Sequence, residues 1–183
     1  MSARDSGRSR VYAAEQLVRR VYDLADRSDC RTLNIHGSHI TLPIERRFAD
    51  TNSIQRYLDL VTNLSWVRDE WPRAAVPLRV RARAGQRAAH YERHTATIAI
   101  PPYESNQAWA MREFVVLHEL AHHLAPDAAA AAHGPEFVDR CSRLVTELIG
   151  AEAGLLLRST MHSEGVTTTL PSTETTIEPA ITL

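Results

Sequence analysis

The spacing of apolar residues predicts helices toward both ends of the chain. Residues 10–28 carry an apolar side chain every three or four positions, with charged residues between them, which is typical of an amphipathic helix. The same spacing predicts helices over residues 53–64, 135–149 and 151–161. Residues 33–42 instead alternate around a Gly-Ser pair, which favours one or two short strands.

Three further strands are predicted in the middle of the chain. Residues 78–84, 87–92 and 95–100 are rich in alternating or β-branched side chains. Short turns at Gly85-Gln86 and Arg93-His94 separate them, so we expect an antiparallel meander. A small antiparallel sheet packed beside several helices predicts the α+β fold class.

The length and composition predict one domain with a flexible segment at each end. At 183 residues with 44% hydrophobic residues, the chain is long enough for a single core, which we place at residues 10–164. We expect disorder in residues 1–9 and in the threonine-rich residues 165–183. The net charge of −1 gives no support to a nucleic-acid partner. No run is apolar enough for a membrane span or a signal peptide, so we expect a cytoplasmic protein.

Residues 118–122 read HELAH, and this motif is the strongest chemical signal in the chain. Apolar side chains surround it from Phe114 to Leu124, which predicts a buried helix. His118 and His122 would project from one face, about one turn apart, and two imidazoles so placed can bind one Zn²⁺. Glu119 would lie about 100° around the helix, where a carboxylate can take a proton from water. Polar groups on a buried helix are costly unless something such as a metal satisfies them.

A catalytic zinc usually takes three protein ligands, so a third donor is expected nearby. His133 is the favoured candidate, because it precedes a Gly-Pro pair that suits a turn into a new helix. Glu136, Asp127 and His123 remain alternatives. His123 is the weakest, because it points about 100° away from the preceding histidine.

Four residues are candidates for contacting a substrate. His90 and Tyr91 lie on a predicted strand, and Tyr103 follows the next one, so these three are expected to border the cleft. Tyr91, Tyr103 and His123 are candidates for stabilising the oxyanion that forms when a carbonyl is attacked.

The run VVLHELAHHLA followed by HGPEF resembles the SprT-like and related minimal zincins. The chain resembles more closely a group of zinc metallohydrolases of actinobacteria and their phages, through RVYAAE, QRYLDLVTNLSWVRDEWP, VRARAGQRAAHYE, HGPEFVDRC and GAEAGLLLR. The resemblance implies a zincin-like minimal metalloprotease fold in which His118, His122 and His133 bind zinc and Glu119 is the catalytic acid/base. SprT-like proteins that process DNA-bound proteins commonly carry a cysteine zinc ribbon, whereas this chain has only Cys30 and Cys141, far apart.

The sequence therefore predicts a zinc-dependent hydrolase, and first of all a metallopeptidase acting on a peptide or protein. Three alternatives stay open: a site-specific proteolytic regulator of one partner, a non-peptidase amide hydrolase, and a binding module with structural zinc. The sequence does not indicate the oligomeric state.

Overall fold

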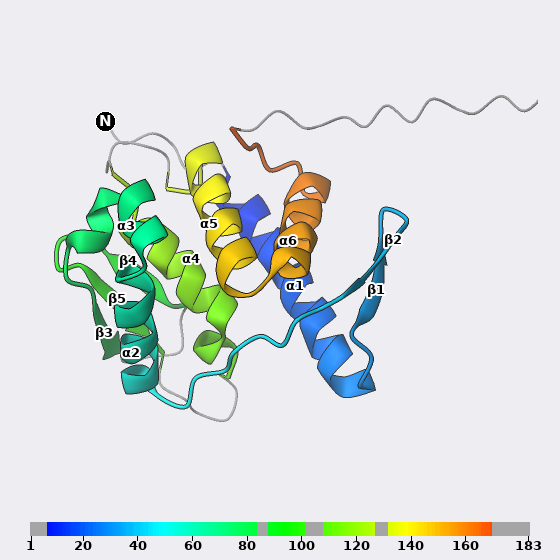
Figure 1. The fold of residues 1–183 in the computed structure, drawn as a ribbon, viewed down its shortest axis with the longest axis horizontal. Helices are drawn as coiled ribbons and strands as arrows, with labels where there is room; N and C mark the ends of the chain where they lie inside the picture. The colour runs from blue at the N-terminus through cyan, green and yellow to red at the C-terminus, as the bar shows by residue number, and fades with distance from the viewer. Residues whose placement is uncertain (1–6, 84–87, 102–107, 127–131, 170–183) are drawn as a thin grey trace, which may run out of the picture.

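Six α-helices, two short 3-10 helices (Pro72–Ala75 and Ala108–Met111) and two small sheets make up the part of the chain that the computed structural model describes, namely residues 7–83, 88–101, 108–126 and 132–169 (Figure 1). The predicted α+β class is confirmed. Within these residues, no helix is both long enough and apolar enough to cross a membrane.

The helices pack in a chain of neighbours across the molecule. In Figure 1, α4 and α5 lie in the middle, α1 and α6 lie to one side, and α2, α3 and the three-stranded sheet lie to the other. Each contact buries an apolar face, so that residues such as Val18, Leu120 and Leu144 are fully buried. The bounds are α1 Arg8–Ser28, α2 Thr51–Thr62, α3 Ser65–Glu70, α4 Glu113–His123, α5 Pro135–Leu148 and α6 Ala151–Ser163.

The three-stranded sheet is mixed, and the predicted antiparallel meander is wrong. Its order is β3-β5-β4, where β3 is Arg79–Ala82, β4 is His90–Glu92 and β5 is Thr97–Ile100. β5 pairs parallel with β3 and antiparallel with β4. All four residues of β5 are buried, so it takes the centre, whereas its two partly exposed neighbours form the edges. β4 is therefore an edge strand, and it packs against α4.

The predicted strands at 33–42 form a hairpin of β1 (Thr32–Ile35) and β2 (Ser38–Thr41). Its turn residues His36 and Gly37 have φ angles of 50° and 80°, the left-handed pair of a two-residue hairpin turn. In Figure 1 the hairpin starts at the end of α1 and turns back, so that it lies at the outer side of α1 and α6. After β2 the chain runs back to the start of α4, where Phe48 N donates to Met111 O at 2.8 Å.

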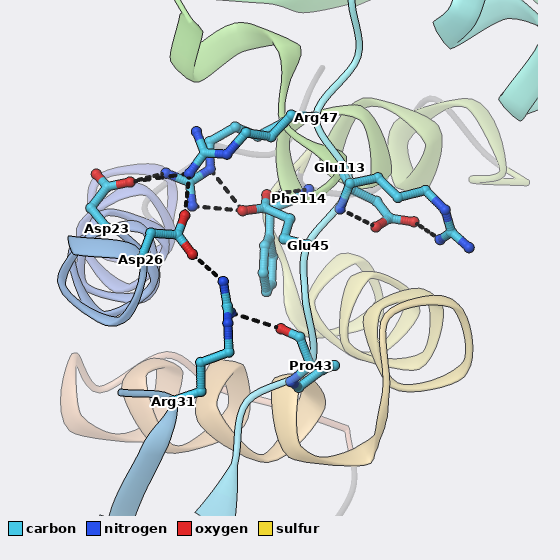
Figure 2. A network of polar contacts seen from close by, with 10 residues as sticks. Asp23, Asp26, Arg31, Pro43, Glu45, Arg47, Glu113 and Phe114 are labelled. Carbon is cyan, nitrogen blue, oxygen red and sulfur yellow. Dashed lines mark hydrogen bonds and ion pairs between the residues drawn. The ribbon is translucent and has the colours of Figure 1, made fainter. Parts of the chain in front are cut away.

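A buried ion pair fixes the start of α4 against this returning segment and against α1. The carboxylate of Glu45 accepts from Arg112 Nε at 2.8 Å and Nη2 at 2.6 Å, and also from the backbone N–H of Phe114 at 3.1 Å. Arg112 Nη1 donates to Asp23 on α1 at 2.7 Å. Figure 2 shows Glu45 reaching the helix start from a neighbouring strand of chain. The first turn of α4 thus receives a carboxylate where its free N–H groups point.

A second carboxylate completes this cluster. Glu113, fully buried, accepts from the backbone N–H of Arg46 at 3.0 Å and pairs with the Arg46 guanidinium (Figure 2). It also accepts from Tyr57 Oη at 2.7 Å. Every charged group of the cluster has an opposite partner, so α4 is held at a defined position. We call the set the N-terminal network: Asp23, Glu45, Arg46, Arg112 and Glu113.

The chain ends differ slightly from expectation where they are described. α1 begins at Arg8, two residues before the predicted helix, and Gly7 precedes it. At the other end, Thr169 N donates to Asp139 Oδ2 at 3.0 Å. The rest of the predicted terminal segments, residues 1–6 and 170–183, lies outside the described residues.

Candidate metal centre

Three histidine side chains converge between α4 and the start of α5. His118 and His122 come from successive turns of α4, and His133 comes from the turn that precedes α5. Nε2 of His118 lies 3.2 Å from Nε2 of His122 and 3.4 Å from Nε2 of His133. Tetrahedral zinc with Zn–N bonds of about 2.0–2.1 Å separates its donors by roughly 3.3 Å. The donor spacing therefore fits one metal ion, and all three donor atoms lie within 4.8 Å of one another.

Glu15 on α1 holds His118 in the orientation that a metal ligand needs. Its Oε1 lies 2.6 Å from Nδ1 of His118, so Nδ1–H donates to the carboxylate and Nε2 faces the other two rings. Burial alone would lower the pKa of His118, but the carboxylate of Glu15 raises it to about 9. Burial, together with the charges of His118 and His133, lowers the pKa of His122 to about 2. Three imidazole nitrogens face one another in a buried place, and a metal ion between them would satisfy all three. The three histidines can therefore hold a metal ion.

Packing fixes the third histidine against α1 and α5. Gly7 lies so close to His133 that a Cβ at this position would come within 2.6 Å of the His133 carbonyl oxygen. Pro135 opens α5 immediately after the turn, as predicted from its fixed φ. The Phe137 ring contacts the rings of His118, His122 and His133, with centroids 4.9, 4.5 and 4.9 Å away. The turn therefore has little freedom to move its imidazole away from α4.

Glu119 lies beside the histidines but is not one of the converging donors. Its side chain is only 4% exposed and lines the adjoining cavity. Burial raises the pKa of Glu119 to about 7, while the charge of His118 and a backbone hydrogen bond from Tyr91 act in the opposite direction. A carboxyl with such a pKa can both accept and release a proton near neutral pH.

A cavity of about 800 Å³ adjoins the three histidines. Its walls come from the start of α1, the β4 edge strand, the end of α4 and the first turns of α5. Glu119, His122 and His133 reach it directly, and Tyr12 lines it from α1. The donors therefore face a space large enough for a small ligand or a few residues of a peptide.

The other predicted residues occupy several environments. His90 and Tyr91 both line the cavity. His90 hydrogen-bonds Arg83 and Glu92, at 3.1 and 3.2 Å, through its two ring nitrogens. Glu136 is exposed and lines the cavity without joining the three donors. Tyr103 and Asp127 lie outside the described residues.

His123 belongs to a separate hydrogen-bonded chain. Arg73 Nη2 donates to Tyr91 Oη at 3.0 Å, and Tyr91 Oη donates to Nδ1 of His123 at 3.0 Å. Burial lowers the pKa of His123 to about 4, so the ring is neutral and can accept this bond. Among the described residues, His123 neither joins the three donors nor lines the cavity. It instead anchors the Tyr91 side chain of the edge strand.

Sequence reasoning missed the contribution of α1 to the site. Glu15 binds His118, while Tyr12 packs 5.4 Å from the rings of both His118 and His133. Arg8 lies over the Tyr12 ring, 5.5 Å from its centroid, and lines the cavity. Arg8, Tyr12 and Glu15 are four and three residues apart, which places them on one helix face. That spacing was a readable signal, although nothing local connects it to residues more than one hundred positions later.

No protein-family model, curated protein or solved structure matches the chain. An α+β class alone does not identify a function, because one class hosts many chemistries. What can be inferred about activity therefore comes from the site itself, with its converging imidazoles, its buried carboxyl and its cavity.

Proposed function

We propose that the protein is a zinc-dependent hydrolase, and specifically a zincin-like metallopeptidase that cleaves peptide bonds. The observation that carries this proposal is the convergence of three imidazole donors at the wall of a cavity that a buried carboxyl also lines. His118, His122 and His133 would bind the ion, and an all-imidazole donor set suits zinc. When bound, zinc supplies Lewis acidity, which polarises a carbonyl and lowers the pKa of water toward about 7.

Glu119 is the residue that moves the proton. An ionised Glu119 takes a proton from the attacking water and afterwards gives it to the leaving amine. The carboxyl also accepts a backbone hydrogen bond from Tyr91, which places it beside the edge strand β4. One group thus serves as general base and then as general acid.

The edge strand β4 supports a peptide rather than a small amide as substrate. β4 pairs with β5 on one side only, and His90 and Tyr91 line the cavity from it. An extended peptide can add to such an edge through backbone hydrogen bonds, which bind any sequence. The Arg73–Tyr91–His123 chain holds this strand against α4 and so keeps the edge at a fixed distance from the histidines.

The surroundings of the donors also favour catalysis over a structural zinc. A structural zinc is usually enclosed by four protein ligands, whereas catalytic zinc keeps one position for water or substrate. Among the described residues three donors converge, and two of them line a cavity of about 800 Å³. Such a site supports exchange with substrate.

The decisive experiment measures metal content and peptide cleavage in wild type and Glu119→Gln. We expect wild type to contain about one zinc per chain and to cleave members of a proteome-derived peptide pool, read by mass spectrometry of the new termini. Glu119→Gln should keep its zinc and lose at least about 100-fold in cleavage rate, because it removes the proton acceptor.

Glu136→Gln is the matched control, because Glu136 lines the same cavity from the solvent side and lies outside the donor group. It should retain both zinc and most of the cleavage. Full zinc content with unchanged cleavage in Glu119→Gln would refute the proposed role of Glu119.

A further inference from the structure

The cavity beside the histidines carries more cationic than anionic side chains. Four arginines line it, while Glu119 and Glu136 are the only carboxylic acids among the described lining residues. The chain as a whole has a net charge of −1, so the cavity differs in sign from the rest of the molecule. The four arginines are Arg8, Arg83, Arg93 and Arg140.

Arg140 is the most unusual of these arginines. Its side chain extends from α5, it is only 7% exposed, and its Nε is buried without a hydrogen-bond partner. Within the described part of the chain no ion pair or hydrogen bond engages its guanidinium. Burial lowers the pKa of Arg140; the charge of nearby Glu136 acts against this shift, and the charge of Arg93 acts with it. A buried and unpaired guanidinium is costly, so the site is set up to receive an anion.

The other cavity arginines are either exposed to solvent or already hydrogen-bonded. Arg8 is exposed and lies over the Tyr12 ring, 5.5 Å from its centroid. Arg93 donates to the carbonyl oxygens of Ala125 and Pro126, both at 3.1 Å, and Arg83 donates to Ala88 O at 2.6 Å. Arg93 and Arg140 repel each other across the cavity wall, and a bound anion would relieve that repulsion. The unmet demand for negative charge is therefore concentrated at Arg140.

We propose that Arg140 binds a carboxylate of the peptide substrate, so that the enzyme selects peptides with an acidic group close to the cleaved bond. This inference rests on the proposed peptidase function. A guanidinium offers planar, paired N–H donors that match a carboxylate, and it binds the carboxylate more strongly than the corresponding neutral amide. Either an Asp or Glu side chain or a free C-terminus supplies this chemistry.

Binding can be tested without turnover in the zinc-loaded full-length Glu119→Gln protein. The probes are Ac-Ala-Glu-Ala-NH₂ against Ac-Ala-Gln-Ala-NH₂, and Ac-Ala-Ala-Ala-OH against its C-terminal amide, titrated by calorimetry. We expect the acid of at least one pair to bind roughly tenfold or more tightly than its amide, as for a charge-assisted hydrogen bond in a buried site. The pair that shows the difference identifies the source of the carboxylate.

Arg140→Met keeps an unbranched side chain about as long as the aliphatic part of arginine and removes the guanidinium, and should abolish the difference between acid and amide. Arg140→Lys should retain part of it, since the charge remains without the planar fork. The control is Arg143→Met on the same helix, because Arg143 is half exposed and pairs with Glu147; it should leave the preference unchanged.

Equal affinities of acid and amide in both pairs overturn the inference, and so does a preference that persists in Arg140→Met. If Arg140→Met does not fold, the inference is decided by the difference between acid and amide probes in the Glu119→Gln protein and by the change of that difference in Arg140→Lys. Acid-selective binding without any cleavage in the wild-type peptide digest removes the proposed peptidase function and leaves the anion site standing. Cleavage without any acid preference removes the anion site at Arg140 and leaves the proposed peptidase function standing.

Discussion

The two ends of α4 each carry a buried polar cluster, and they differ in how completely the protein satisfies them. At the start of the helix, the N-terminal network pairs every carboxylate with a guanidinium or a backbone N–H. Near its end, three imidazole nitrogens face one another, and within the described residues no ion pair or hydrogen bond engages the guanidinium of Arg140 nearby. Arg112 and Arg140 show the contrast most directly, since both are buried arginines and, among the described residues, carboxylates form ion pairs with Arg112 and not with Arg140.

This difference separates stability from function on a single helix. A cluster that closes on itself fixes the position of the helix and gains nothing from a ligand. A cluster whose charges and lone pairs face one another gains free energy when a cation or an anion arrives. The two clusters share α1 and α4: Arg112 at the start of α4 bonds Asp23 of α1, and His118 further along α4 contacts Glu15 of α1.

The largest effect is expected when one imidazole is removed from the histidine cluster of His118, His122 and His133. His133→Ala leaves two donors, so we expect zinc affinity to fall by at least about 100-fold, measured by competition with a chromophoric chelator. His39→Ala, an exposed histidine of the hairpin, is the control and should bind zinc like wild type. Unchanged affinity in His133→Ala would assign the third ligand to another residue.

A change in the N-terminal network should instead lower stability and leave zinc binding intact. Arg112→Met leaves Glu45 buried without its guanidinium, so the free energy of unfolding should fall by about 3–5 kcal/mol in urea denaturation. The folded fraction should still bind about one zinc per chain. Arg47→Met is the control, because Arg47 is 46% exposed and its ion pairs with Asp23 and Asp26 are screened by water. If the folded fraction of Arg112→Met bound clearly less than one zinc per chain, the N-terminal network would have to be counted as part of the metal site.

Local pattern was enough to predict most of the helices and the donors on α4. The helical spacing and the HELAH segment depend on residues within two turns of one another, and Gly134-Pro135 indicates the start of α5 in the same local way. The pairing of β3 with β5 was not predictable from short turns, because burial of β5 from both sides decides it. Glu15 and Arg140 escaped for the same reason. Their roles depend on contacts across the fold: the spacing of Glu15 indicates a helix face, but nothing in the nearby sequence connects that face to His118, or Arg140 to the cavity.

A smaller effect is expected from a change at Glu15, which joins α1 to the histidine cluster. Glu15→Gln keeps the size of the side chain and removes the charge that orients His118. Zinc affinity should fall about 10–100-fold, as for the loss of other carboxylates that hold a ligating histidine. Gln16→Glu is the control, because it adds a carboxylate at an exposed neighbouring position of α1. This added charge should not change the zinc affinity. Wild-type affinity in Glu15→Gln would limit Glu15 to a packing role.

The smallest expected effect is the pH dependence of stability in the metal-free protein. Glu15 raises the pKa of His118 from 6.5 to about 9, so the folded state holds a proton there that the unfolded chain has released. The resulting stabilisation is fully present below about pH 6.5 and is lost as the pH rises through about 9. Between pH 7 and 9 the free energy of unfolding should therefore fall by about 2 kcal/mol more in wild type than in Glu15→Gln, measured in urea. Equal losses in both proteins would contradict this. Because Arg112 stays charged throughout this range, Arg112→Met should lower stability equally at both pH values, which separates the titrating end of α4 from the non-titrating one.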